Sequence, residues 1–171
     1  MQKYETKLYN VIFPIWLLII LPVTWIVVLP VNFIIDLLVV TLTLKFMKIQ
    51  NIKSTIKAVI LKVWIFGFIS DILGSIFMFL SQIIEFPNHD WWYEYIINSV
   101  AYDPFSSIYA VLWITVCIFI TGILIYFFNY KISFKKASLT ILEKKRLALS
   151  VAIFTAPYLF YLPTKWFYRG P

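Results

Sequence analysis

Long apolar stretches dominate the chain, and short polar or charged segments separate them. A helix needs about 20 apolar residues to cross a hydrocarbon core of about 30 Å. The pattern therefore predicts an all-α fold, a polytopic bundle of transmembrane helices in one membrane-embedded domain, residues 1–171. The predicted spans cover residues of about 10–29, 31–47, 58–84, 104–127 and 147–165.

The first apolar stretch is too long for a single crossing. Residues 10–44 contain one charged residue, Asp36. One helix over them would be roughly 50 Å long at about 1.5 Å per residue. We therefore expect two spans joined by a tight turn at Pro30, because proline lacks an N–H and fixes φ. A re-entrant hairpin is the alternative. The first span reads as a retained signal anchor, since no small-residue cleavage site follows it.

The segment between the third and fourth spans is polar and aromatic. Its tryptophan and tyrosine rings suit the headgroup region, where an amphipathic ring meets both solvents. We expect a short interfacial helix over residues of about 90–101. Asp103 and Pro104 predict the start of the next span, because aspartate caps helices and proline suits their first turn.

Composition agrees with a membrane protein. The chain is 62% hydrophobic and 13% charged, with a mean hydropathy of +0.88, whereas soluble domains are about half apolar and a quarter charged. A soluble enzyme, a nucleic-acid-binding domain and a disordered chain are excluded as descriptions of the whole. The net charge of +7 lies between the spans, as in loops that face an anionic leaflet, so nucleic acid is not an expected partner. The use of Ile, Lys, Phe and Asn is compatible with a bacterial source.

Basic residues gather in two of the connections. The residues concerned are Lys45, Lys48, Lys53 and Lys57 around one, and Lys131, Lys135, Lys136, Lys144, Lys145 and Arg146 in the other. Residues 85–105 between them contain acids but no Lys or Arg. With five spans, the positive-inside tendency predicts a multi-pass cell-membrane protein with a cytoplasmic N-terminus and an extracytoplasmic C-terminus. Lys165 and Arg169 do not fit this orientation.

Two aspartates lie inside predicted spans, where a carboxylate costs several kcal/mol unless it is paired or protonated. Asp71 lies at the centre of the third span, and Asp36 lies about 8 Å inside the outer end of the second. No basic residue occurs near either depth, so desolvation favours the neutral acid. Three interpretations are open: hydrogen-bonded contacts between helices, a proton or cation site in a transport path, and a catalytic pair as in intramembrane aspartic proteases. The difference in depth argues against the last, as does the sequence Gly67-Phe-Ile-Ser-Asp71, which lacks the Gly-x-Gly-Asp motif of those enzymes.

Small and polar residues recur on one face of the third span. They are Gly67, Ser70, Asp71, Gly74, Ser75 and Met78, at steps of three and four residues. Small side chains let another helix approach closely. Asn32 and Asp36, one turn apart, form a matching polar stripe on the second span. We expect the stripes to pack together, with Gly67, Gly74 and Ser75 at the contact. A polar cavity with Asp36, Asp71, Asn32 and Ser70 is the functional alternative.

The outer segment contains a second candidate site: His89, Asp90, Trp91, Trp92 and Glu94. Anchoring at the interface is the simplest interpretation, and binding of a cationic or lipid-like ligand is the alternative. One histidine with nearby acids is weak support for a metal, so no metal site is predicted. Gly-rich phosphate loops, paired Cys or His spacings and nucleophile elbows are absent from the sequence, so neither a cofactor nor enzymatic activity is predicted.

These observations favour a small membrane protein that binds or translocates a small solute or ion through a polar interior containing Asp36 and Asp71. The alternative is a non-catalytic membrane subunit or immunity-type protein that acts by packing its helices against a partner. An intramembrane enzyme comes third. Besides the lipid bilayer, the expected partners are the solute or ion and either a second copy or another membrane subunit.

Overall fold

The computed structural model describes residues 14–84 and 89–167, and all regular structure in these ranges is helical. Three helices are long and apolar enough to cross a membrane: α1 (Trp25–Phe46), α2 (Ile52–Ile83) and α5 (Ile108–Phe128). Two short 3-10 turns, Ile15–Ile20 and Pro22–Thr24, precede α1, and a π-helical turn, Asn129–Ser133, extends α5. The predicted helical membrane protein agrees with this architecture, but five spans are not confirmed.

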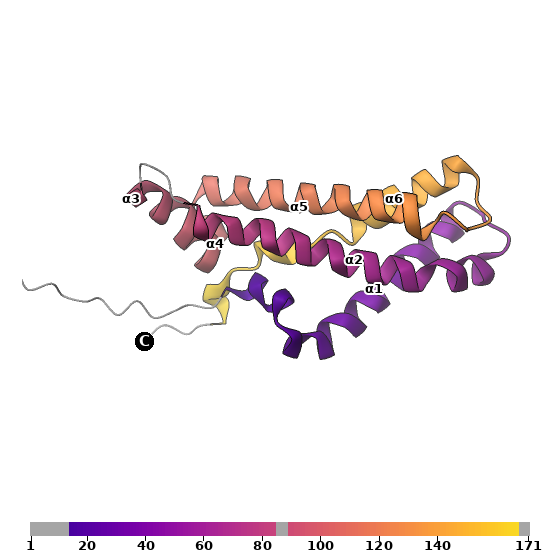
Figure 1. Ribbon diagram of the computed structural model, residues 1–171, viewed down its shortest axis with the longest axis horizontal. Coiled ribbons are helices and arrows are strands. Elements are labelled where there is room, and N and C mark those ends of the chain that lie inside the picture. Colours follow the sequence, from indigo (N-terminus) through magenta and orange to yellow (C-terminus); the bar gives the residue numbers. More distant parts are fainter. Residues whose placement is uncertain (1–13, 85–88, 168–171) are drawn as a thin grey trace, which may run out of the picture.

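Helices α2 and α5 lie side by side along most of their length, whereas α1 packs against α2 obliquely and the backbone of its first turns lies away from it (Figure 1). The shorter helix α6 (Ile141–Phe154) packs between α1 and α5. Two 3-10 turns follow it, Tyr158–Tyr161 and Thr164–Trp166. The backbone N–H of Ile15 donates a hydrogen bond to Thr164 Oγ1 at 3.1 Å, so the first and last described segments meet.

The predicted turn at Pro30 is wrong, because Pro30 lies inside α1. A proline this close to a helix start removes a single intrahelical bond, the one that the Ile26 carbonyl would accept. The chain changes direction earlier, in the two 3-10 turns before α1. There the Thr24 hydroxyl donates to the Leu21 carbonyl at 2.7 Å, and the Trp25 indole donates to the Ile19 carbonyl at 3.0 Å. These side chains satisfy carbonyls that a continuous helix would have paired.

Two other boundaries also differ from the prediction. Residues Pro104–Ser106 form a separate 3-10 turn, and α5 begins only at Ile108, because Asp103 forms an ion pair with Lys165 instead of capping the helix. The last predicted span is not one helix: α6 ends at Phe154, before Pro157. Its start is fixed by a capping box, in which Thr140 Oγ1 accepts from the Glu143 N–H at 3.3 Å and Glu143 accepts from the Thr140 N–H at 2.7 Å.

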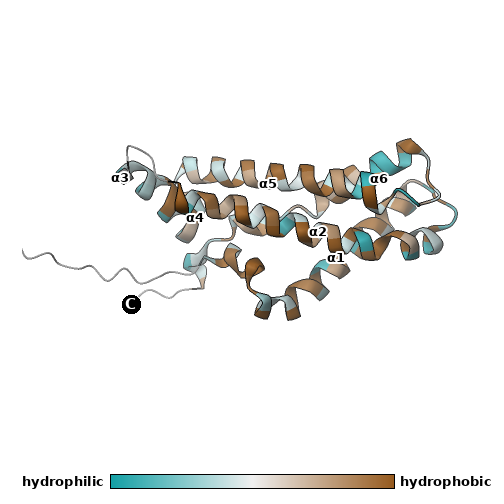
Figure 2. Ribbon diagram, viewed as in Figure 1, coloured by the Kyte–Doolittle hydropathy of each residue, from teal (hydrophilic) through white to brown (hydrophobic). Residues whose placement is uncertain are grey.

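The two basic connections meet at one end of the bundle, which we call the basic end. Lys48 of the first connection and Lys136 of the second line the same shallow hollow. The hydrophilic colour is concentrated there, at the loops and the start of α6 (Figure 2). Beneath it lies a hydrophobic cluster that includes Leu44, Val63 and Leu147.

The opposite end of the bundle contains a continuous helical segment over residues 89–102. It comprises α3 (His89–Trp92), a π-helical turn (Tyr93–Asn98) and α4 (Ser99–Tyr102). Its bounds are close to those of the predicted interfacial helix; its location at a membrane interface stays a prediction. A second hydrophobic cluster lies below it and includes Trp16, Trp92 and Phe160.

Candidate functional site: an acidic cavity beside α1 and α2

Asp36 of α1 and Asp71 of α2 are neighbours in the structure. Their side chains are 4% and 7% exposed. A Cβ atom built on Gly67 would lie 3.5 Å from Asp36 Oδ2, an ordinary contact distance, so this carboxyl lies beside α2 at Gly67. One turn further along α2, Asp71 lines the same cavity as Asp36. The predicted difference in depth is therefore wrong: α1 begins at Trp25, which puts Asp36 near its middle.

Few polar groups compensate these two carboxyls. Asn32 Nδ2 donates to Asp71 Oδ2 over a long 3.5 Å, and Asp71 Oδ1 is buried without a hydrogen-bond partner among the described residues. No Lys or Arg in the described ranges forms an ion pair with either acid. A buried polar atom without a partner costs free energy, and a buried charge costs more. The pair is thus short of one positive charge or proton.

The two acids face a cavity of about 460 Å³. This volume lies within the range of pockets that hold small molecules. Asn32 and Asp36 come from α1, and Gly67 and Asp71 from α2. The remaining wall is mostly apolar and aromatic. The first 3-10 turn, the two long helices, the end of α6 and the chain after it contribute Ile15, Trp16, Leu18, Ile19, Val28, Ile35, Phe68, Phe154, Thr155, Ala156, Pro157, Tyr158, Leu159 and Phe160. The sequence prediction missed the C-terminal part of this wall, because it assigned those residues to the last membrane span.

The small-residue stripe of α2 contacts two different helices. Gly67 meets Asp36 of α1, whereas a Cβ atom on Gly74 would lie 2.1 Å from Thr121 Oγ1 of α5 and 3.2 Å from Phe160 Cε2. Gly74 therefore permits a close approach that no larger residue allows. Ser75 is buried, and its hydroxyl has no partner in the described residues.

Ser70 does not belong to the cavity wall. It is buried, and its hydroxyl donates to the Phe66 carbonyl of the same helix at 2.7 Å. Of the four residues predicted for the intramembrane polar site, the structure brings together Asn32, Asp36 and Asp71. Ser70 packs within the bundle instead.

The outer aromatic segment has two different faces. Trp92 is buried: its indole donates to the Ser81 carbonyl at 3.1 Å, and its ring packs edge-on against Trp113, with centroids 5.9 Å apart. Trp92, predicted from the sequence as part of the outer candidate site, is therefore a residue of the hydrophobic core. Trp91 is partly exposed and lies 4.8 Å from the ring of Tyr109.

The acids of this segment, Asp90 and Glu94, are exposed, and the His89 side chain lies outside the described residues. Within the described ranges, no three His, Cys, Asp or Glu residues are arranged to hold a metal ion. The outer segment therefore presents aromatic rings and exposed acids at the surface, whereas Asp36 and Asp71 in the acidic cavity are buried.

Comparisons with known proteins do not add to this geometry: no family model, curated protein or solved structure matches the chain. The arguments for a function therefore come from the acidic cavity, defined by Asn32, Asp36, Asp71 and the apolar wall around them.

Proposed function

We propose that this protein binds a small monovalent cation between Asp36 and Asp71 and exchanges it with a proton across the membrane. The observation that supports the proposal is the pair of adjacent buried carboxyls, which face a cavity whose described lining contains no basic residue to neutralise them. Ionisable residues within transmembrane segments commonly mark ion paths and proton relays.

The chemistry of such a site follows from its charges. Two neighbouring carboxyls at this depth cannot both be ionised unless something positive lies between them. In the vacant site they hold a proton, and a cation that enters replaces it. Asn32 donates to Asp71 Oδ2, which leaves the unpartnered Oδ1 to bind the proton or the cation. The rings of Trp16, Phe68 and Phe160 in the cavity wall supply faces that attract cations.

The proposal includes an orientation. The basic end faces the cytoplasm, in keeping with the excess of Lys and Arg in cytoplasmic loops. α1, α2 and α5 cross the membrane, and α6 with the turns after it returns to the outer side. The pairing of Lys165 with Asp103 supports this arrangement, because it neutralises a basic residue at the outer end. The hydrogen bond between Ile15 and Thr164 supports an outer location for both segments. In this proposal Ile15 therefore lies on the outer side, in place of the first span from the cytoplasm that the sequence predicted.

Proton flux in reconstituted vesicles tests the function. Purified protein is incorporated into liposomes that contain a pH-sensitive dye, and Na⁺, K⁺ or tetramethylammonium is added outside. At least one of these cations is expected to drive proton movement in the wild-type protein. Asp71→Asn keeps the size of the side chain but cannot exchange a proton, so it should abolish the flux. Asp90→Asn, the same change at an exposed position, should leave the flux unchanged.

The same experiment separates the other interpretations. Full flux in folded Asp71→Asn would contradict the proposal. Absence of flux in the wild-type protein with all three cations would also contradict it and favour a subunit that works by packing against a partner. Asp36→Asn provides a second test if Asp71→Asn does not fold. Association with a second copy or another membrane subunit is compatible with either outcome.

A further inference from the structure

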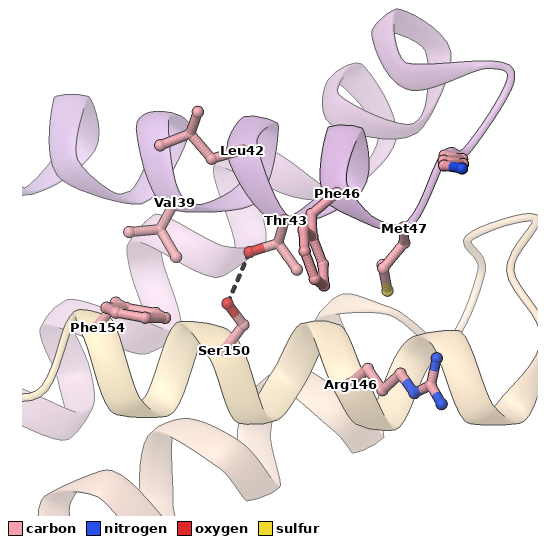
Figure 3. Close-up of a pocket in the computed structure, with 9 residues that line it drawn as sticks. Val39, Leu42, Thr43, Phe46, Met47, Arg146, Ser150 and Phe154 are labelled. Carbon is pink, nitrogen blue, oxygen red and sulfur yellow. Dashed lines mark hydrogen bonds between the residues drawn. The ribbon is translucent and has the colours of Figure 1, made fainter.

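A second cavity, of about 730 Å³, lies between α1 and α6 and is separate from the acidic pair. We call it the α1–α6 groove, and Figure 3 shows its walls. Its lining residues are Val39, Leu42, Thr43, Phe46, Met47 and Lys48 of α1 and the turn after it, and Arg146, Ser150 and Phe154 of α6. The function proposed above does not use this groove.

The groove has a cationic end and an apolar length. Arg146 and Phe154 lie at its two ends, with Ser150 between them, and Ser150 bonds across the groove to Thr43 at 2.6 Å (Figure 3). Eight residues of helix separate the ends, which is about 12 Å. That length is close to the roughly 15 Å of hydrocarbon in one leaflet. Lys48 also lines the groove and adds a second positive charge at the basic end.

The walls are accessible from the surface of the bundle. Leu42 is 62% exposed and Phe154 is 67% exposed. In a helix bundle within a membrane, such side chains meet lipid. The groove is therefore open along the side of the bundle, with the basic residues at one end and apolar walls along its length.

We propose that the α1–α6 groove binds one anionic phospholipid, with the phosphate at Arg146 and Lys48 and an acyl chain extending toward Phe154. Basic pockets between transmembrane helices on the cytoplasmic side are suited to anionic headgroups. Arginine matches a phosphate with two parallel N–H donors. The charge of the groove selects the headgroup, and its apolar length selects a lipid over a soluble phosphate.

Native mass spectrometry of the delipidated protein in detergent tests this site. The probes are dioleoylphosphatidylglycerol, dioleoylphosphatidylcholine and glycerol 3-phosphate. The wild-type protein should bind one phosphatidylglycerol at least fivefold more tightly than phosphatidylcholine, and it should not retain glycerol phosphate. Arg146→Gln should weaken phosphatidylglycerol binding about fivefold, since one basic residue near a membrane surface contributes about that factor.

A matched control lies beside the tested residue. Lys145 is exposed on the same helix and does not line the groove, so Lys145→Gln should change the affinity less than twofold. Equal affinity of the wild-type protein for the two lipids would overturn the proposal, and this comparison needs no variant to fold. Equal losses in Arg146→Gln and Lys145→Gln would also overturn it, because the effect would then be general surface charge. If glycerol phosphate bound as tightly as the lipid, the acyl chain would contribute nothing to binding, and the proposal of a lipid site would be overturned.

Discussion

The acidic cavity and the α1–α6 groove both lie beside α1 and share Phe154 as a wall residue, yet they differ in charge and accessibility. The acidic pair is almost fully buried near the middle of α1. Arg146 is exposed on the second turn of α6, beside a wall that opens on the bundle surface. The difference indicates what each can hold: a small ion beside enclosed carboxyls, and a long amphipathic molecule beside exposed basic groups.

The packing of the helices explains why both cavities follow α1. In the most apolar stretch of the first candidate span, which contains α1, only 11% of the residues are buried, compared with 44% in that of α2. α2 contacts α1 on one side and α5 on the other, so its small residues are enclosed. α1 has one well-packed face, and its contact with the short α6 leaves unfilled space. The two cavities thus arise where a long helix meets shorter segments.

Cysteine labelling should give the largest difference between the two ends of the bundle. A residue on the outer side is labelled in intact cells, and a residue on the inner side is not. Ser54 is exposed at the basic end and Asn98 at the other end. A membrane-impermeant maleimide added to intact cells should label Asn98→Cys and leave Ser54→Cys unmodified until the cells are opened. The native Cys117 is buried and provides the unlabelled background. Labelling of Ser54→Cys in intact cells would contradict the proposed orientation, because the basic end would then face outward.

Two glycines of α2 should respond differently to the same substitution. Gly74→Ala forces Thr121 and Phe160 to move, and overpacking of this kind costs about 1–3 kcal/mol of unfolding free energy. Gly67→Ala meets only an ordinary 3.5 Å contact with Asp36, so its stability should change by less than about 1 kcal/mol. Denaturant unfolding in detergent measures both. Equal destabilisation would show that the close approach of α5 at Gly74 is not what the structure indicates.

The smallest expected effect is at the hydrogen bond across the groove. Ser150→Ala removes the partner of Thr43 and should reduce the unfolding free energy by about 0.5–1.5 kcal/mol. Because Ser150 does not line the acidic cavity, cation-driven proton flux should be unchanged. A loss of flux in folded Ser150→Ala would mean that the two cavities are coupled and cannot be treated separately.

The sequence predicted the parts of this arrangement that depend on residue spacing. Asn32 and Asp36 on one helix, and Gly67 and Asp71 on another, recur at helical intervals, and the structure brings these two stripes together. The small size of Gly67 and Gly74 indicated close contacts. It did not indicate that they contact different helices, since spacing along one helix identifies a face and not its neighbours.

Other features depend on competition between local signals. Pro30 was predicted to form a turn, but a proline near a helix start is tolerated. The last span was predicted to continue to about residue 165, but α6 ends at Phe154, before Pro157. Asp103 pairs with a lysine 62 residues away, which no local pattern predicts. The capping box from Thr140 to Glu143 was visible in the sequence as Thr-x-x-Glu. Its recognition would have located the start of α6 and, with it, Arg146 on the groove.

Proton release on cation binding tests the central claim most directly. Purified protein in weakly buffered detergent solution is titrated with the cation that drives flux, and the released protons are measured for the wild-type protein, Asp71→Asn and Arg146→Gln. The account predicts proton release by the wild-type protein and Arg146→Gln, binding that strengthens as the pH rises because protons compete, and at least a tenfold loss of affinity in Asp71→Asn. Wild-type proton release by folded Asp71→Asn would contradict it.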